Sequence, residues 1–152
     1  MKKFVLTALA ALSFLISNAQ EKITFKALDG VIITADVYMA GDDKPMILLC
    51  HQAGYSRGEY KEIAPELNKM GYNCIAIDQR SGDEVNGVKN ETARDALSKG
   101  LGTDYLDAEK DIIAAIKYIS FRYNPEKFFL WGSSYSASLV LKKNSRTPTR
   151  LK

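Results

Sequence analysis

Apolar and polar residues alternate along two short segments that flank Asp29 and Gly30. Residues 23–27 and 33–38 are each apolar at every second position, a period that is typical of β-strands. An Asp-Gly pair between two such segments favours a tight turn. The pattern therefore predicts an antiparallel hairpin over residues 22–38.

Two later segments, residues 45–50 and 72–77, are largely apolar and do not alternate cleanly. This is the pattern of central parallel strands that are covered on both faces. Between them, apolar residues recur at helical spacing from Tyr60 to Met70, and Gly71 is placed to end that helix. Pro65 falls inside the pattern, so the regular helix should begin near Glu62 or be kinked at the proline.

A longer amphipathic pattern runs from residue 103 to residue 123. Thr103 is a candidate N-cap, acidic residues occupy the first turn, and Asn124-Pro125 ends the pattern. An apolar strand over residues 128–131 and a further helix follow. Strands that alternate with helices predict an α/β fold with a mostly parallel, doubly wound sheet that opens with an antiparallel hairpin. We see neither an internal repeat nor a linker, so residues 20–152 should form one domain.

Two segments fall outside this regular scheme. Residues 79–102 form a long, polar, glycine-containing stretch at the carboxyl end of a central strand, where α/β proteins bind ligands; a mobile surface loop is the alternative. Residues 142–152 form an irregular tail with basic and no acidic residues. Binding to an acidic partner, disorder, and truncation or an altered reading frame all remain open for this tail.

The first 19 residues have the three parts of a secretory signal peptide. Two lysines precede an apolar run, and small residues lie before a cleavage point that we place after Ala19. The sequence thus predicts export to the periplasm or the extracellular space. The apolar run is shorter than the roughly 20 residues that span a bilayer, so no stable membrane anchor is expected. Removal of Lys2 and Lys3 lowers the formal charge from +3 to +1, which predicts neither a nucleic-acid nor a membrane-surface partner.

The two cysteines, Cys50 and Cys74, both lie in predicted buried strands. A cysteine in such a place is usually a small apolar filler, although an exported chain could oxidise the pair to a disulfide. The chain has no cluster with credible metal-ligand spacing. We therefore expect no metal and no cofactor.

The strongest candidate for chemistry is the sequence Gly132-x-Ser134-x-Ser136. It follows an apolar strand and opens a helix, which is the context of a nucleophile elbow, a sharp turn that raises a serine hydroxyl above the sheet. Gly132 and Ser136 are small enough to let strand and helix approach closely. The alternative is an ordinary serine-rich N-cap after a buried strand.

A second constellation begins with His51 and Gly54 after the strand at 45–50, and a third with Asp78 after the strand at 72–77. The order of hairpin, His-x-x-Gly loop, helix, strand, long helix and elbow resembles the N-terminal half of the α/β-hydrolase family. Secreted dienelactone-hydrolase-like and esterase-like members are most similar. The resemblance covers the chain from residue 20 to about Leu141.

The resemblance implies that Ser134 is the nucleophile of a serine hydrolase that acts on small-molecule carboxylic esters or lactones through an acyl-serine intermediate. It implies one oxyanion donor at the backbone N–H of Tyr135 and a second at Ala53, with Gln52 as the alternative. It also implies that His51 braces the oxyanion loop, and that Asp78 shapes a loop through turn and salt-bridge contacts with Arg80 as a candidate partner. The alternative for His51 is a general base within hydrogen-bond distance of the Ser134 hydroxyl.

The chain contains one histidine, and the family takes its acid and base from loops after later strands. A serine hydroxyl is a poor nucleophile until a base accepts its proton, so we expect little or no activity from this polypeptide alone. Two other functions remain open. One is a non-catalytic binding module that has lost the triad; the other is a flavodoxin-like protein that holds a phosphate at the turn before the last helix.

Overall fold

The computed structural model describes residues 20–144, and its centre is a five-stranded sheet. The strands are β1 (Glu21–Lys26), β2 (Ile32–Tyr38), β3 (Met46–Cys50), β4 (Asn73–Ile77) and β7 (Phe128–Gly132), in the spatial order β1-β2-β4-β3-β7. β1 and β2 form the predicted antiparallel hairpin, and β2 is also antiparallel to β4. β3 runs parallel to both β4 and β7. The predicted fold class is confirmed.

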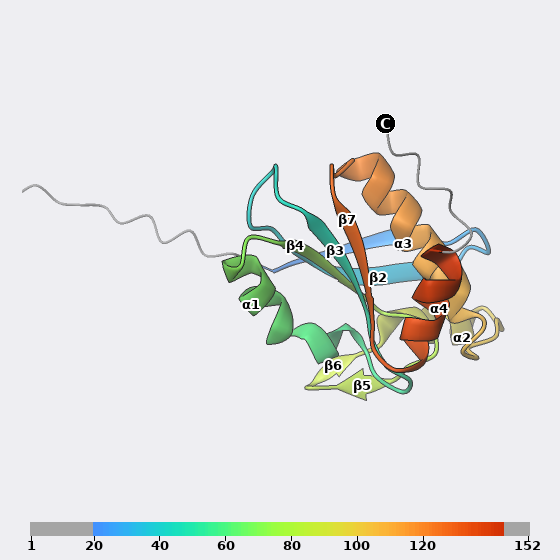
Figure 1. Ribbon diagram of the computed structural model, residues 1–152. Coiled ribbons are helices and arrows are strands. Elements are labelled where there is room, and N and C mark those ends of the chain that lie inside the picture. Colours follow the sequence, from blue (N-terminus) through green and yellow to red (C-terminus); the bar gives the residue numbers. More distant parts are fainter. Residues whose placement is uncertain (1–19, 145–152) are drawn as a thin grey trace, which may run out of the picture.

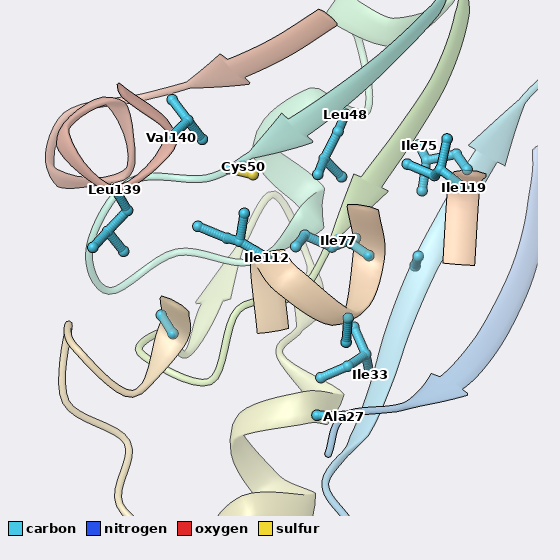
Figure 2. Packing of buried hydrophobic residues seen from close by; sticks show 14 of the residues in the cluster. Ala27, Ile33, Leu48, Cys50, Ile75, Ile77, Ile112, Ile119, Leu139 and Val140 are labelled. Atoms are coloured by element: carbon cyan, nitrogen blue, oxygen red, sulfur yellow. The ribbon is translucent and has the colours of Figure 1, made fainter. Parts of the chain in front are cut away.

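Helices cover both faces of the sheet (Figure 1). α1 (Ile63–Lys69) packs on one face, and α2 (Glu91–Ser98), α3 (Ala108–Arg122) and α4 (Tyr135–Asn144) pack on the other. Because successive strand residues point to opposite faces, Leu48 joins the larger core under α3 while Leu49 joins the smaller core under α1. Figure 2 shows Ile112 of α3 and Leu139 of α4 in the larger core with residues of β3 and β4.

The two cysteines are free and buried on opposite sides of the sheet. Cys50 belongs to the larger core and Cys74 to the smaller one. Both are apolar fillers, as predicted, and the alternative of a disulfide between them is wrong. Burial raises the pKa of the Cys74 thiol to about 12, so this side chain stays protonated.

The first helix begins where the proline indicated. A 3₁₀ turn, η1 (Arg57–Tyr60), comes first, and α1 then starts at Ile63 with Glu62 at the N-cap position. Gly71 follows the helix with a φ of +88°, a left-handed conformation that glycine adopts without a steric cost.

The predicted start of the long helix is wrong. α3 begins at Ala108 rather than at Thr103, and its N-cap position is held by Asp107 without a side-chain cap. Residues 104–107 form a turn in which the backbone N–H groups of Asp107 and Ala108 both donate to the carbonyl of Asp104. Tyr105, which the amphipathic pattern from residue 103 places on the apolar face of the helix, therefore lies before it.

Residues 79–102 are not the continuous loop that their composition suggested. They contain a small hairpin, β5 (Glu84–Val85) with β6 (Val88–Lys89), followed by α2. Asn86 and Gly87 both have positive φ at the hairpin turn, and the side chain of Asn90 caps α2 by accepting from the N–H of Ala93 at 2.8 Å. An Asn-Gly pair is a strong hairpin signal, but the flanking strands are only two residues long and too short to show an alternating pattern.

The predicted signal peptide, residues 1–19, and the last eight residues of the predicted basic tail lie outside the described residues. The predicted start of the irregular tail at residue 142 is wrong, because α4 continues to Asn144. Within residues 20–144, no helix is both long enough and apolar enough to cross a membrane.

Candidate active site

Ser134 lies at the turn between β7 and α4, at the same end of the sheet as the loop after β3 and the β5–β6 hairpin (Figure 1). Its φ is +54°, a left-handed conformation that costs a non-glycine residue roughly 1–2 kcal/mol, and its side chain is exposed. The turn is held on both sides. Ser133 N–H donates to the Cys50 carbonyl at 3.0 Å, and Ala137 N–H donates to the Ser134 carbonyl at 3.0 Å. The predicted nucleophile thus occupies a strained, exposed strand-to-helix turn.

Gly132 is required by the close approach of α4 to β7. A Cβ atom built at this position would lie 2.6 Å from the backbone nitrogen of Ala137 and 2.6 Å from the carbonyl carbon of Ser136. Both are backbone atoms, so they cannot move aside as a flexible side chain would.

Ser136 is buried and ties the elbow helix to the loop after β3. Its hydroxyl donates to the His51 carbonyl at 2.5 Å, and the side-chain amide of Gln79 donates to it at 2.9 Å. A small hydroxyl residue at this position therefore joins the ends of three strands, β3, β4 and β7.

The predicted oxyanion donors come from two elements. Tyr135 is the first residue of α4, and the first N–H groups of a helix have no partner within the helix. Ala53 lies in the turn after β3, next to Gly54, which has a φ of +75° and donates its own N–H to the Ser81 carbonyl at 3.2 Å. In the described part of the chain, neither Ala53 N–H nor Tyr135 N–H has a hydrogen-bond acceptor. Both amides are therefore unpaired.

His51 is fully buried, and both of its ring nitrogens are engaged. Nδ1 lies 2.7 Å from the Gln52 carbonyl, so it carries the proton, and Nε2 accepts from Gln79 N–H at 2.8 Å. Burial lowers the pKa of His51 from 6.5 to about 4. A neutral ring with two occupied nitrogens holds the loop after β3 against the loop after β4, and it has no free nitrogen with which to accept a proton from Ser134.

Asp78 makes its salt bridge with Arg57, not with Arg80 as the sequence suggested. Its carboxylate accepts from Arg57 N–H at 2.8 Å, from the Arg57 guanidinium at 2.6 Å, and from Glu91 N–H at 2.8 Å. Arg80 instead pairs with Asp111 and Asp29, each at 2.7 Å. Strand order alone did not show which of two buried arginines would face Asp78.

Three further residues support the site and were not singled out from the sequence. The Gln79 side chain contacts Ser136 and the Tyr135 hydroxyl, and the Asn90 amide donates to the carbonyls of Gln79 and Tyr55. At Gly82, a Cβ would lie 1.8 Å from the Tyr55 carbonyl oxygen. Polar residues clustered directly after a buried strand are the signal that could have identified Gln79 and Asn90.

An aromatic pair lies beside the elbow. The Tyr135 ring packs against that of Tyr105 with 4.8 Å between centroids, and the Tyr135 hydroxyl is held by Gln79 at 3.0 Å and by Ser81. Burial raises the pKa of Tyr135, so its hydroxyl remains protonated. Among the described residues, no group of three or more His, Cys, Asp and Glu side chains is arranged to hold a metal ion.

The arrangement of these elements is similar to that of several solved structures. The esterase Pf2001 of Pyrococcus furiosus superposes with a TM-score of 0.62 and 21% identity, over 86% of this chain and 48% of that chain. A thermostable carboxyl esterase from Bacillus coagulans superposes with a TM-score of 0.65 and 16% identity, over 84% of this chain and 40% of that chain. The α/β hydrolase GrgF from Penicillium sp. sh18 superposes with a TM-score of 0.62 and 16% identity, over 85% of this chain and 42% of that chain. The chain has the α/β-hydrolase fold. The resemblance inferred from the sequence is thereby confirmed at the level of the fold.

The chain spans less than half the length of these α/β-hydrolase neighbours. Among curated proteins, the thiohydrolase apmlB of Arthrinium phaeospermum is 25% identical over 124 residues, which are 80% of this chain and 37% of that protein. No family model matches the chain.

Proposed function

We propose that this chain carries the nucleophile and oxyanion elements of a serine hydrolase for small carboxylic esters or lactones. The observation that carries the proposal is an exposed serine, Ser134, in a left-handed strand-to-helix turn at the sheet end that also bears two unpaired amides. An elbow of this kind presents a nucleophile, and two amide N–H groups that donate to the same oxygen stabilise the charge that develops on a carbonyl oxygen.

In the proposed reaction, Ser134 Oγ attacks the carbonyl carbon of the ester and the carbonyl oxygen becomes an oxyanion between Ala53 N–H and Tyr135 N–H. The tetrahedral intermediate then expels the alcohol, which takes up a proton, and leaves an acyl-serine. Water hydrolyses this intermediate to the acid. The serine proton has to pass to a base, and the chain's one histidine, His51, is engaged at both nitrogens. We therefore propose weak activity for this chain by itself.

The names of the similar proteins support this substrate class. They include an esterase, a carboxyl esterase and a thiohydrolase, all of which are hydrolases by name. The aromatic pair Tyr105 and Tyr135 beside the elbow supports a substrate with an apolar acyl or alcohol group.

A non-catalytic binding module is the second candidate, and the engagement of His51 favours it. A serine without a base does not need to react, and the two amides beside Ser134 can hold the carbonyl of an acyl compound without its cleavage. Reactivity of Ser134 separates the two candidates.

Labelling with a fluorophosphonate, followed by peptide mapping, measures this reactivity. We expect slow labelling confined to Ser134, abolished in Ser134→Ala and unchanged in Ser138→Ala, which replaces an exposed serine of α4. The serine-hydrolase proposal would be rejected if wild type and Ser134→Ala were equally unlabelled at millimolar probe.

We also propose export, on the pattern of residues 1–19. Expression of the full chain in a bacterium with a standard secretory pathway should yield a periplasmic product that begins at Gln20. Recovery of only the intact chain in the cytoplasm would contradict this.

A further inference from the structure

Three of the four consecutive backbone N–H groups in the loop after β3, from Gln52 to Tyr55, donate to an acceptor. Gln52 N–H donates to Glu59 Oε2 at 2.8 Å, Gly54 N–H to the Ser81 carbonyl at 3.2 Å, and Tyr55 N–H to the Gln52 carbonyl at 3.3 Å. Of these four consecutive amides, only that of Ala53 has no acceptor within the described residues. A buried or half-buried amide is normally paired, so this vacancy is informative.

The peptide unit that joins Gln52 to Ala53 is fixed from the carbonyl side. The Gln52 carbonyl accepts from His51 Nδ1 at 2.7 Å and from Tyr55 N–H at 3.3 Å. In a planar trans peptide the C=O and the N–H point in opposite directions. Since the carbonyl points toward buried His51, Ala53 N–H points away from it.

The preceding peptide unit is fixed by a carboxylate from a different element. Glu59 belongs to η1, whose start is capped by the Ser56 hydroxyl, which accepts from Gly58 N–H at 3.1 Å. The bond from Gln52 N–H to Glu59 is charge-assisted, and such bonds are roughly twice as strong as neutral ones. Because Gln52 N–H already donates to Glu59, it is not available as an oxyanion donor in place of Ala53 N–H.

We propose that Glu59 is a positioning residue that selects Ala53, rather than Gln52, as the oxyanion donor of this loop. The carboxylate holds the Gln52 amide, and the anchored Gln52 carbonyl then directs Ala53 N–H outward. The catalytic consequence rests on the proposed function, whereas the pairing of the amides can be tested without it.

Amide hydrogen exchange of the full chain, followed by NMR, reads the pairing directly. In wild type we expect Gln52 to be protected and Ala53 to be less protected. In Glu59→Ala, exchange at Gln52 should accelerate by about tenfold or more, because a hydrogen bond to a charged acceptor is lost. Glu59→Gln keeps an oxygen acceptor and should restore most of the protection. Glu62→Ala removes an exposed acid that makes no cap hydrogen bond and should change neither amide.

The rate of fluorophosphonate labelling at Ser134 supplies the second readout. It should fall about tenfold in Glu59→Ala and recover in Glu59→Gln, since the phosphonyl oxygen uses the same donors as the oxyanion. If Glu59→Ala does not fold, Glu59→Asp, whose carboxylate is one methylene shorter, should show the same acceleration at Gln52.

Unchanged exchange at Gln52 in these variants, or stronger protection at Ala53 than at Gln52 in wild type, would overturn the inference. If exchange at Gln52 accelerates as expected in Glu59→Ala but Ser134 is labelled in none of the proteins, the amide assignment is supported and the proposed function is rejected.

Discussion

Individual residues around Ser134 hold the turn in a conformation that a serine does not favour. The Tyr60 hydroxyl donates to the Cys50 carbonyl at 2.8 Å and lies 2.9 Å from Ser133 Oγ, so η1 is joined to the residue just before the elbow. Ser136 makes the equivalent connection on the other side of Ser134. A backbone strain of roughly 1–2 kcal/mol persists only where such contacts over-determine the conformation.

The stabilising contribution of His51 should be lost at mildly acidic pH. Burial keeps the pKa of His51 at about 4 in the folded chain, against 6.5 when it is unfolded. The unfolded state therefore binds a proton that the folded state excludes, so the contribution of His51 is complete above pH 6.5 and is lost as the pH falls to 4. The contribution of His51 to the free energy of unfolding should fall by about 3 kcal/mol, and urea unfolding of wild type and of a His51 variant measures it as a difference.

His51→Gln is the comparison that isolates this effect. Burial raises the pKa of Asp78 to about 6, so Asp78 acts with the opposite sign in the same pH range. That contribution is present in both proteins and cancels in their difference. The stability difference between wild type and His51→Gln should shrink steadily from pH 7 to pH 4; a constant difference would contradict the burial argument.

Gly132 leaves no room for a side chain between β7 and α4. Gly132→Ala places a methyl group against the backbone of α4, so it should lower the free energy of unfolding by about 1–3 kcal/mol and reduce labelling at Ser134. Gly100→Ala is the control, because Gly100 has a φ of +66° but open space around it. It should cost roughly 1 kcal/mol through backbone strain and leave labelling unchanged.

Secondary-structure elements are joined at the site end of the sheet by two buried arginines. Arg57 in η1 contacts Asp36 of β2 at 3.1 Å, Asp78 after β4 at 2.6 Å and Glu91 of α2 at 3.0 Å. Arg80 joins the turn after β1 to α3 through Asp29 and Asp111. These ion pairs explain why Asp36, on the polar side of an alternating strand, is buried.

Removal of Arg57 should be costly because it leaves two buried carboxylates without their partner. Arg57→Ala should lower the free energy of unfolding by about 3–5 kcal/mol in chemical denaturation. Lys22→Ala removes an exposed partner of the same Glu91 and should cost less than about 1 kcal/mol. Equal losses in the two variants would show that burial does not set the strength of these pairs.

The sequence predicted most elements whose cause is local, with the β5–β6 hairpin at Asn86-Gly87 as an exception, and it failed where the cause is tertiary. The hairpin at Asp29-Gly30, the helix start near Glu62 and the sharp turn at Ser134 follow from turn chemistry, proline geometry and small residues. The partner of Asp78 depends on which arginine the folded loop brings near, and this has no signature at short range. The start of α3 at Ala108 has a local cause, the turn at residues 104–107, but the amphipathic pattern continues through that turn.

The molecule as a whole is asymmetric at its two sheet edges. β1 belongs to a hairpin with polar exposed residues, whereas β7 carries apolar side chains on both faces. Phe129 and Trp131 are 47% and 44% exposed, and within residues 20–144 β7 pairs on one side only, with β3. A strand with an unpaired edge and apolar faces is a template for pairing with another chain.

The open edge of β7 therefore predicts that the chain self-associates. Trp131→Lys places a charge on the open edge, a device by which natural proteins prevent strand pairing, and should reduce concentration-dependent association in sedimentation velocity. Phe121→Lys adds the same charge at a 92% exposed position on α3 and serves as the control. If both lysines reduced association equally, net charge rather than the β7 edge would be its cause.

Since β7 also carries the elbow, a chain paired at this edge would lie beside Ser134, so Trp131→Lys should in addition raise the rate of fluorophosphonate labelling at high protein concentration.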